Sequence, residues 1–267
     1  MAKVELYHND MSSCSQKVRL VLEEKNIRWT GHHMNLRKGE TRTKTYIKHF
    51  NKNGVVPTLV YKNDIIIESS IIMEYLEDTF PQNALRPSNP ANIAQMRLKN
   101  RKIDDVLHSA IAIISSCIAF RHQFLENNNN EELTKLINLI PDKERRDISK
   151  DTIFNGLESK LLPNALLEYI KVFNELDEFL SSNNWLAGNH YTLADAAYTP
   201  YLTRFEHLNL SFLFEEKKYL CDWFCKVKRK ENFTKAILRW NNNDYLSLMN
   251  EKGTQAKSKI KNIIPKS

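Results

Sequence analysis

The chain has 267 residues, of which 42% are apolar and 27% are charged, as in a globular protein of one large or two modest domains. The 39 Lys and Arg exceed the 32 Asp and Glu by seven, but these charges are scattered apart from residues 226–230 and 257–266. Without a zinc-finger spacing, an RNA-binding aromatic motif or an arginine-rich block, this distribution argues against nucleic acid as a partner. No apolar run approaches the ~20 residues of a membrane span. The four cysteines have neither metal-ribbon nor disulfide-framework spacing. We therefore expect a cytoplasmic protein with no metal and no membrane contact.

The first 81 residues alternate strand and helix signals. Val4 and Leu6 alternate with polar neighbours as in a short strand, and apolar residues at helical spacing then continue to Lys25. A polar break at residues 62–64 between two apolar runs predicts a β-hairpin. The predicted order is β-α-β-α-β-β-α, over residues 4–6, a helix ending near 25, then 27–36, 41–50, 58–61, 65–67 and 69–80. A βαβ unit favours parallel pairing and a hairpin is antiparallel, so we expect a mixed four-stranded sheet with helices on its faces.

The rest of the chain reads as all-helical. Helical patterns cover residues 92–126, 131–138, 160–181, 192–206 and 216–228. Thr192 and Asp195 have the spacing of a capping box, in which each side chain bonds the other residue's backbone amide. Pro87 and Pro90 mark a linker. We divide the chain into an α/β domain over 1–81, a linker over 82–91, an all-α helical bundle over 92–250 and a basic, mobile tail over 251–267.

Val56 and Pro57 precede the third predicted strand. A proline at this position gives up one backbone donor. If the peptide bond between them is cis, the chain turns and presents the Val56 amide and carbonyl to an extended peptide ligand. Only about 5–6% of such bonds are cis, so an ordinary loop-to-strand proline is the favoured interpretation of these two residues alone.

Glu68 and Ser69 lie where a strand ends and a helix begins. The free amides and positive dipole end of a helix N-terminus suit a carboxylate, and Glu68 can hold an ammonium group. The pair therefore suits the amino-acid end of a ligand. Simple N-capping by Ser69 is the alternative, and both interpretations can hold together.

Ser12, Ser13, Cys14 and Ser15 follow the first strand and begin the first helix. A hydroxyl that donates to a sulfur, together with nearby amides, favours the thiolate at neutral pH. Cys14 can itself be a thiol of low pKa at this helix start. The alternative is that the serines cap the helix and Cys14 packs on its buried face, and the sequence leaves both open.

Together these three elements, in this order and spacing, resemble the glutathione transferase superfamily. Ser12-Ser13-Cys14 followed by residues 18–20 (VRL) is similar to the zeta-class motif. Residues 72–81 (IMEYLEDTFP), 85–87 and 96–97 are similar to bacterial glutathione-dependent β-etherases, and residues 185–188 and 191–195 to the helical-domain signature. The resemblance covers residues 3–240. It implies a thioredoxin-like domain followed by an all-helical domain, in a homodimer.

The resemblance implies how glutathione binds. Val56, before a cis Pro57, would pair its backbone with the cysteinyl part, and Glu68 and Ser69 would hold the γ-glutamyl end. Two further positions complete the implied contacts: Lys44 with the glycyl carboxylate, and Asp104 with a γ-glutamyl amine across the dimer interface.

The resemblance also implies where the chemistry occurs. Ser12 lies where related classes place the residue that faces the glutathione sulfur, and Ser13 and Cys14 line the same site in the zeta motif. A second-substrate site is expected between this loop and the helix that begins near residue 92, with five candidate lining residues: His108, Ile111, Ile114, Ser115 and Phe120. An exposed helix residue without a role in the site is the alternative for His108.

The leading hypothesis is an enzyme that binds glutathione as co-substrate and directs its thiolate at a small apolar or aromatic electrophile, by conjugation or by ether or halide cleavage. Three alternatives stay open: a zeta-like cis–trans isomerase, thiol–disulfide or reductive dehalogenase chemistry at Cys14, and a non-catalytic binding module on the same fold. The chain is longer than a typical zeta enzyme, with extra material at about 126–162. A similar extension in the ether-cleaving enzymes weakens the isomerase assignment.

Overall fold

A computed structural model describes residues 3–126 and 128–264 of the chain, and its N-terminal part has the predicted order of elements. Two elements differ in detail. The second strand is shorter than expected, and a 3-10 turn over Glu40–Arg42 precedes the second helix. The elements are β1 (Val4–His8), α1 (Ser13–Glu24), β2 (Trp29–His33), α2 (Lys44–His49), β3 (Thr58–Tyr61), β4 (Asp64–Ile67) and α3 (Ser69–Thr79).

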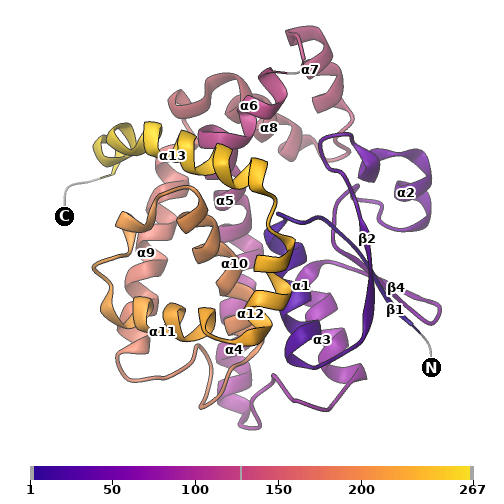
Figure 1. Cartoon of the computed structure of the whole chain (residues 1–267), viewed down its shortest axis with the longest axis vertical. Coiled ribbons are helices and arrows are strands. Elements are labelled where there is room, and N and C mark those ends of the chain that lie inside the picture. The colour runs from indigo at the N-terminus through magenta and orange to yellow at the C-terminus, as the bar shows by residue number, and fades with distance from the viewer. Residues whose placement is uncertain (1–2, 127, 265–267) are drawn as a thin grey trace.

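The four strands form one mixed sheet in the order β2-β1-β3-β4. Strand β1 runs parallel to β2, with Leu6 opposite Gly31, and antiparallel to β3, with Leu6 opposite Leu59. Strand β4 folds back on β3 as the expected hairpin. Figure 1 shows α1 and α3 on the side of the sheet that faces the helical part, and α2 on the other side. The predicted fold class, a thioredoxin-like domain followed by an all-helical domain, is confirmed.

One long helix opens the helical part and runs over Pro90–Leu125. It consists of α4 (Pro90–Lys102), a π turn over Ile103–Leu107, α5 (His108–Ser115), a second π turn over Ser116–Phe120 and α6 (Arg121–Leu125). The later helices are α9 (Leu162–Leu180), α10 (Leu193–His207), α11 (Lys218–Lys228), α12 (Glu231–Ala236) and α13 (Asn243–Ile263), with 3-10 turns over Gly156–Glu158, Ser211–Leu213 and Leu238–Trp240. Helix α10 is buried along almost its whole length and packs against α1, so it joins the two parts of the chain.

The sequence analysis expected no apolar stretch close to the length of a membrane span, but the long helix Pro90–Leu125 is such a stretch. By length and composition alone it could cross a bilayer, with a mean hydropathy of 1.6 over its most apolar window. In the structure, 56% of that window is buried inside the protein. Core helices of globular proteins meet the same criterion, so this helix is weak evidence for a membrane.

The extra segment before α9 forms a small unit that packs on the second half of the long helix. It contains α7 (Asn130–Asn138) and α8 (Lys143–Asn155), and α8 lies in a stretch where no helix was expected. A separate apolar cluster holds the unit together, made of Leu133, Ile137, Ile140 and Ile153. In Figure 1 the unit lies beyond the end of the sheet, next to α2. Two arginine hydrogen bonds connect it to the sheet domain, Arg42 to the Leu136 carbonyl at 3.1 Å and Arg145 to the Asn53 carbonyl at 3.4 Å.

The prediction of a mobile tail over 251–267 is wrong for residues 251–263, which are helical. Helix α13 continues to Ile263, and Ala256 and Ile260 are buried. Gly253 lies so close to the Leu208 carbonyl that a Cβ there would be 1.6 Å from the oxygen, so α13 packs directly on the end of α10. The polar composition of this stretch reflects the solvent-facing side of an amphipathic helix. Residues 265–267 lie outside the described part.

The predicted capping box at the start of α10 is confirmed. The Asp195 carboxylate accepts from the Thr192 backbone amide at 2.8 Å. It also accepts from the Leu186 amide at 3.0 Å and from the Trp223 indole at 2.7 Å, although it is fully buried. Asp195 therefore joins three segments of the helical domain through one carboxylate, a structural role.

Candidate active site

The N-terminus of α1 carries the serines and cysteine that the sequence singled out. Ser12 is the N-cap, and its hydroxyl oxygen accepts from the Ser15 amide at 3.3 Å. That bond uses an acceptor position, so the Ser12 hydroxyl hydrogen remains available to donate to a ligand. Ser13 begins the helix and is buried. Ser12 therefore caps the helix, as the alternative interpretation of the sequence expected. This role does not exclude a contact between its hydroxyl and the sulfur of a ligand.

Cys14 lies half-buried beside a histidine that is 94 residues away in the sequence. Its Sγ is 3.4 Å from Nδ1 and 3.7 Å from Nε2 of His108. Burial by itself would raise the pKa of the thiol. The charges of His108 and Lys17 and hydrogen bonds from His108 and Ser69 outweigh burial and lower the pKa from 9.0 to about 6. A negatively charged sulfur is therefore the favoured form at this position at neutral pH.

His108 is the partner in this pair, and its own pKa is raised, chiefly by the charge of Cys14. The hydroxyl of the fully buried Tyr201, from α10, lies 3.4 Å from His108 Nδ1. His108 itself is solvent-exposed. The sequence placed His108 in the second-substrate site, but no sequence signal connected it to Cys14 or identified Tyr201.

A buried lysine connects the thiol site to the start of α3. Lys17 Nζ lies 3.5 Å from an Asp104 carboxylate oxygen and 3.4 Å from the Ser70 hydroxyl. Ser70 donates to the same Asp104 oxygen at 2.8 Å. The Lys17 side chain is 1% exposed, so its charge acts in a weakly screened environment. Asp104 thus contacts Ser70, the residue that follows Ser69, the expected γ-glutamyl contact. This contact lies within one chain, whereas the resemblance implied that Asp104 acts across a dimer interface.

The peptide bond between Val56 and Pro57 is cis. The preceding carbonyl, of Val55, accepts from the Tyr46 hydroxyl at 2.9 Å and the Asn51 amide at 3.1 Å. Among the residues that the structure describes, neither the backbone amide nor the carbonyl of Val56 bonds to another group. Both are therefore available to pair with an extended ligand.

Glu68 joins β4 to α3 in an unusual backbone conformation, with φ 68° and ψ 115°. Its exposed carboxylate accepts from the Asn53 amide at 2.9 Å. Ser69, the first residue of α3, is buried, and its hydroxyl is among the groups that lower the pKa of the Cys14 thiol. Lys44, the first residue of α2, is exposed. Ser69 is thus brought to the sulfur site, while Glu68 and Lys44 remain open to solvent.

Three of the other candidates for the second-substrate site, Ile111, Ile114 and Ser115, are buried on α5, and Phe120 is half-buried at the end of the second π turn. The Ser115 hydroxyl accepts from Arg204 at 3.3 Å. Arg204, three residues after Tyr201 on α10, also donates to the Met11 carbonyl just before Ser12. The sequence analysis missed Arg204, because α10 carries several polar and charged residues and nothing in the sequence separates Arg204 from the others.

Over residues 3–126 and 128–264, no group of three or more His, Cys, Asp or Glu is placed to hold a metal ion.

Comparison with known proteins gives two family models that match separate parts of the chain, in order. The glutathione S-transferase N-terminal domain matches residues 11–79, and the C-terminal domain matches residues 157–231. The chain is 26% identical to glutathione S-transferase TCHQD of Arabidopsis thaliana, over 90% of this chain and 91% of that one. It is 25% identical to the protein LigF of Sphingobium, over 93% and 98%. The crystal structure of the β-etherase LigF superposes with a TM-score of 0.79 at 24% identity, over 88% of this chain and 98% of that one. The chain belongs to the glutathione S-transferase family.

Proposed function

We propose that this protein is a glutathione-dependent enzyme that directs the glutathione thiolate at an electrophilic carbon of an apolar or aromatic substrate, by conjugation or by ether or halide cleavage. The observation that carries the proposal is the pair of Cys14 and His108, in which an anionic sulfur is stabilised at the N-terminus of α1. The names of full-length relatives, among them LigF and a tetrachlorohydroquinone reductive dehalogenase, fit such chemistry.

Glutathione would bind along the open backbone of Val56, which leaves its amide and carbonyl free for the cysteinyl residue. Its γ-glutamyl carboxylate would meet the start of α3 at Ser69, and its ammonium group would meet Glu68 or Asp104. Lys44 would contact the glycyl carboxylate. This arrangement points the sulfur at Ser12 and Cys14.

The chemistry follows from the charges at the site. A free thiol has a pKa of about 8.5, and donation by the Ser12 hydroxyl together with the positive charges of Lys17 and His108 would lower it. Two thiolates side by side repel each other. When glutathione is the anion, Cys14 therefore carries the proton. The glutathione sulfur then bonds to carbon, and halide or aryloxide leaves. An aryloxide would take its proton from imidazolium His108.

The first test is binding of glutathione by calorimetry, followed by turnover of aryl halides and β-aryl ethers. Ser12→Ala should lower kcat about 10- to 100-fold with little change in glutathione affinity, because it removes a donor to the thiolate. Ser181→Ala, an exposed serine on the helical domain, is the matched control. The proposal is wrong if glutathione does not bind or if no substrate of either class turns over.

The position of Cys14 favours a second candidate function. In it the Cys14 thiolate attacks the sulfur of a glutathionyl conjugate R–S–G, forms Cys14–S–S–G and releases the carbon group as R⁻, which takes a proton. A second glutathione then attacks the mixed disulfide, regenerates Cys14 and leaves as oxidised glutathione. Two electrons pass from the two thiols to R. This candidate predicts a glutathionylated Cys14 in intact-mass spectra. Full turnover by Cys14→Ala would exclude it.

The proposal includes a homodimer in the cytoplasm. Large apolar side chains are exposed on neighbouring elements of the sheet domain and the long helix: Ile65 at 47%, Ile71 at 59% and Leu98 at 61%. Such a patch suits burial against a second copy. Light scattering tests it, and Ile71→Glu should give monomers. A wild-type monomer would contradict it.

A further inference from the structure

Two arginine side chains meet around one aromatic ring, close to the sulfur site and outside the glutathione contacts. The guanidinium carbon of Arg37 lies 4.9 Å from the ring centre of Phe120, and that of Arg204 lies 5.0 Å from the same centre. Arg37 comes from the loop after β2 and Arg204 from α10, so the pair spans the two domains. We call Arg37, Arg204, Phe120 and Tyr245 the arginine cluster.

The cluster holds more positive charge than the protein neutralises. Arg204 is 5% exposed, and its pKa is lowered to about 10 by burial and by the charge of Arg37. Among the described residues, no carboxylate forms an ion pair with either guanidinium, and the Nε of each is buried without a hydrogen bond. An unpaired buried cation costs several kcal/mol. A bound anion would remove that cost.

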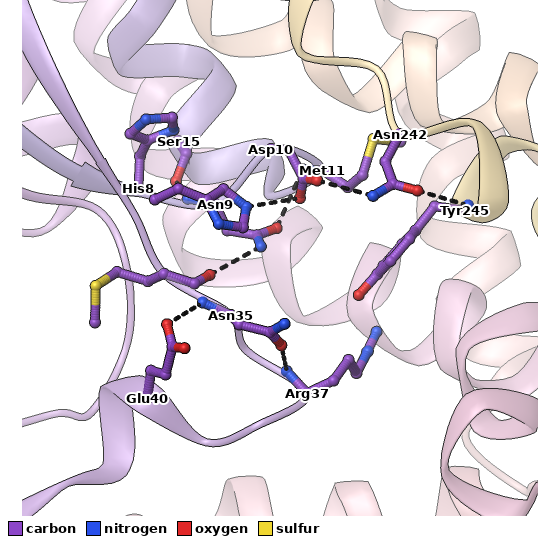
Figure 2. Close-up of polar contacts among 12 residues, drawn as sticks. His8, Asn9, Asp10, Met11, Ser15, Asn35, Arg37, Glu40, Asn242 and Tyr245 are labelled. Carbon is purple, nitrogen blue, oxygen red and sulfur yellow. Dashed lines mark hydrogen bonds and ion pairs between the residues drawn. The ribbon is translucent and has the colours of Figure 1, made fainter. Parts of the chain in front are cut away.

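Asp10, whose charge acts on Arg37, does not neutralise the cluster. Asp10 acts on Arg37 only at a distance. Its carboxylate is engaged by the Met11 amide at 2.8 Å and the Asn242 side chain at 3.2 Å. Figure 2 shows the Arg37 side chain extending toward the hydroxyl of Tyr245, with no contact drawn between it and Asp10. The Tyr245 hydroxyl is neutral and adds no counter-charge.

The cluster is placed to receive one end of a molecule whose other end reaches the sulfur. Arg204 lies three residues after Tyr201 on α10, about 5 Å along the helix, and Tyr201 contacts His108. Arg204 also bonds the Met11 carbonyl, which directly precedes Ser12. At the outer end, Phe120 and Tyr245 are half-buried, so the cluster reaches the surface.

We propose that Arg37 and Arg204 bind the carboxylate of an anionic aromatic second substrate, whose reacting carbon then faces the sulfur at the N-terminus of α1. This inference rests on the proposed function for its reacting end. Phe120 and Tyr245 provide faces against which the substrate ring stacks. Arginine suits this task because its planar donors match a carboxylate at two points.

The binding test uses benzoate, with benzamide as the uncharged molecule of the same shape, titrated by calorimetry in the presence of glutathione. Wild type should bind benzoate at least about tenfold more tightly than benzamide, and Arg37→Gln should abolish the difference. Arg37→Lys, which keeps the charge, should retain part of it. Arg101→Gln is the matched control, because it removes an exposed arginine of the long helix far from the cluster. Equal affinities in wild type, or a preference that survives Arg37→Gln, would overturn the inference.

The turnover test compares 4-chloro-3-nitrobenzoate with 4-chloro-3-nitrobenzamide, both of which lose chloride to the glutathione thiolate. The expected result is a KM at least about tenfold lower for the carboxylate, lost in Arg37→Gln without a matching fall in kcat. A KM equal for both substrates overturns the inference and leaves the proposed function intact. Arginine-dependent benzoate binding without any turnover supports the anion site and refutes the proposed function. Thermal unfolding of each variant identifies effects that come only from lost stability.

Discussion

Replacing His108 by Gln should return the Cys14 thiol toward ordinary acidity. His108 is the largest of the influences that lower the pKa of this thiol, and burial works in the opposite direction. At a pKa of about 6, roughly 90% of Cys14 is thiolate at pH 7, against about 1% at the usual 9.0. Without the imidazolium, we expect the pKa to exceed about 8 and the thiolate fraction at pH 7 to fall below about 10%.

The assay is ultraviolet thiolate absorbance as a function of pH, with the spectrum of Cys14→Ser subtracted to remove Cys117, Cys221 and Cys225. The rate of alkylation by iodoacetamide against pH gives an independent midpoint. Because His108 is solvent-exposed, added salt should raise the wild-type midpoint. Tyr201→Phe is a gentler control that removes one hydroxyl and keeps the charge. A wild-type midpoint near 9, or an unchanged midpoint in His108→Gln, would refute the reasoning about the pair.

Three predictions concern stability. Gly253→Ala should lower the free energy of unfolding by about 3 kcal/mol or more, because its Cβ would meet the Leu208 carbonyl at 1.6 Å. Urea titration measures this, and a loss below about 1 kcal/mol would contradict the close packing of α13 on α10. Asp195→Ala should cost about 3 kcal/mol by removing a buried acceptor of several hydrogen bonds; a shift of less than about 2 °C in Tm would contradict this. Burial lowers the pKa of His8 to about 3 and of His207 to about 4, from 6.5. The contribution of these two histidines to the free energy of unfolding is therefore fully present above pH 6.5 and is lost as the pH falls toward 4. At about pH 5 each should cost roughly 2 kcal/mol relative to neutral pH, and unfolding free energies equal at both pH values would refute this.

Local signals in the sequence predicted most of the fold. The alternation in β1, the hairpin break at residues 62–64 and the capping box at Asp195 each depend on residues close together in the chain. They reappear in the structure with boundaries shifted by a few residues. Helix α13 was missed over its whole length because its apolar positions are sparse, and tertiary packing on α10 decides its conformation.

The residues of the candidate site could be predicted only where a short segment of the sequence marks them. Ser12, Cys14 and Ser69 lie at helix starts, and the sequence marks such starts. The pairing of Cys14 with His108 depends on how the long helix crosses α1, which no local pattern encodes. Arg204 was missed for a related reason: its importance comes from the absence of a nearby counter-charge, which only the packed structure reveals.

The α7–α8 unit has a consequence for motion near α2. Its small cluster of four apolar residues is separate from the main core, and two arginine hydrogen bonds connect it to the sheet domain. Segments with few buried contacts open before the whole molecule unfolds. Backbone amides of α7 and α8 should therefore exchange with deuterium earlier than those of α10. Each such opening would free the carbonyl of Asn53, whose side chain contacts Glu68, one of the residues proposed to bind glutathione.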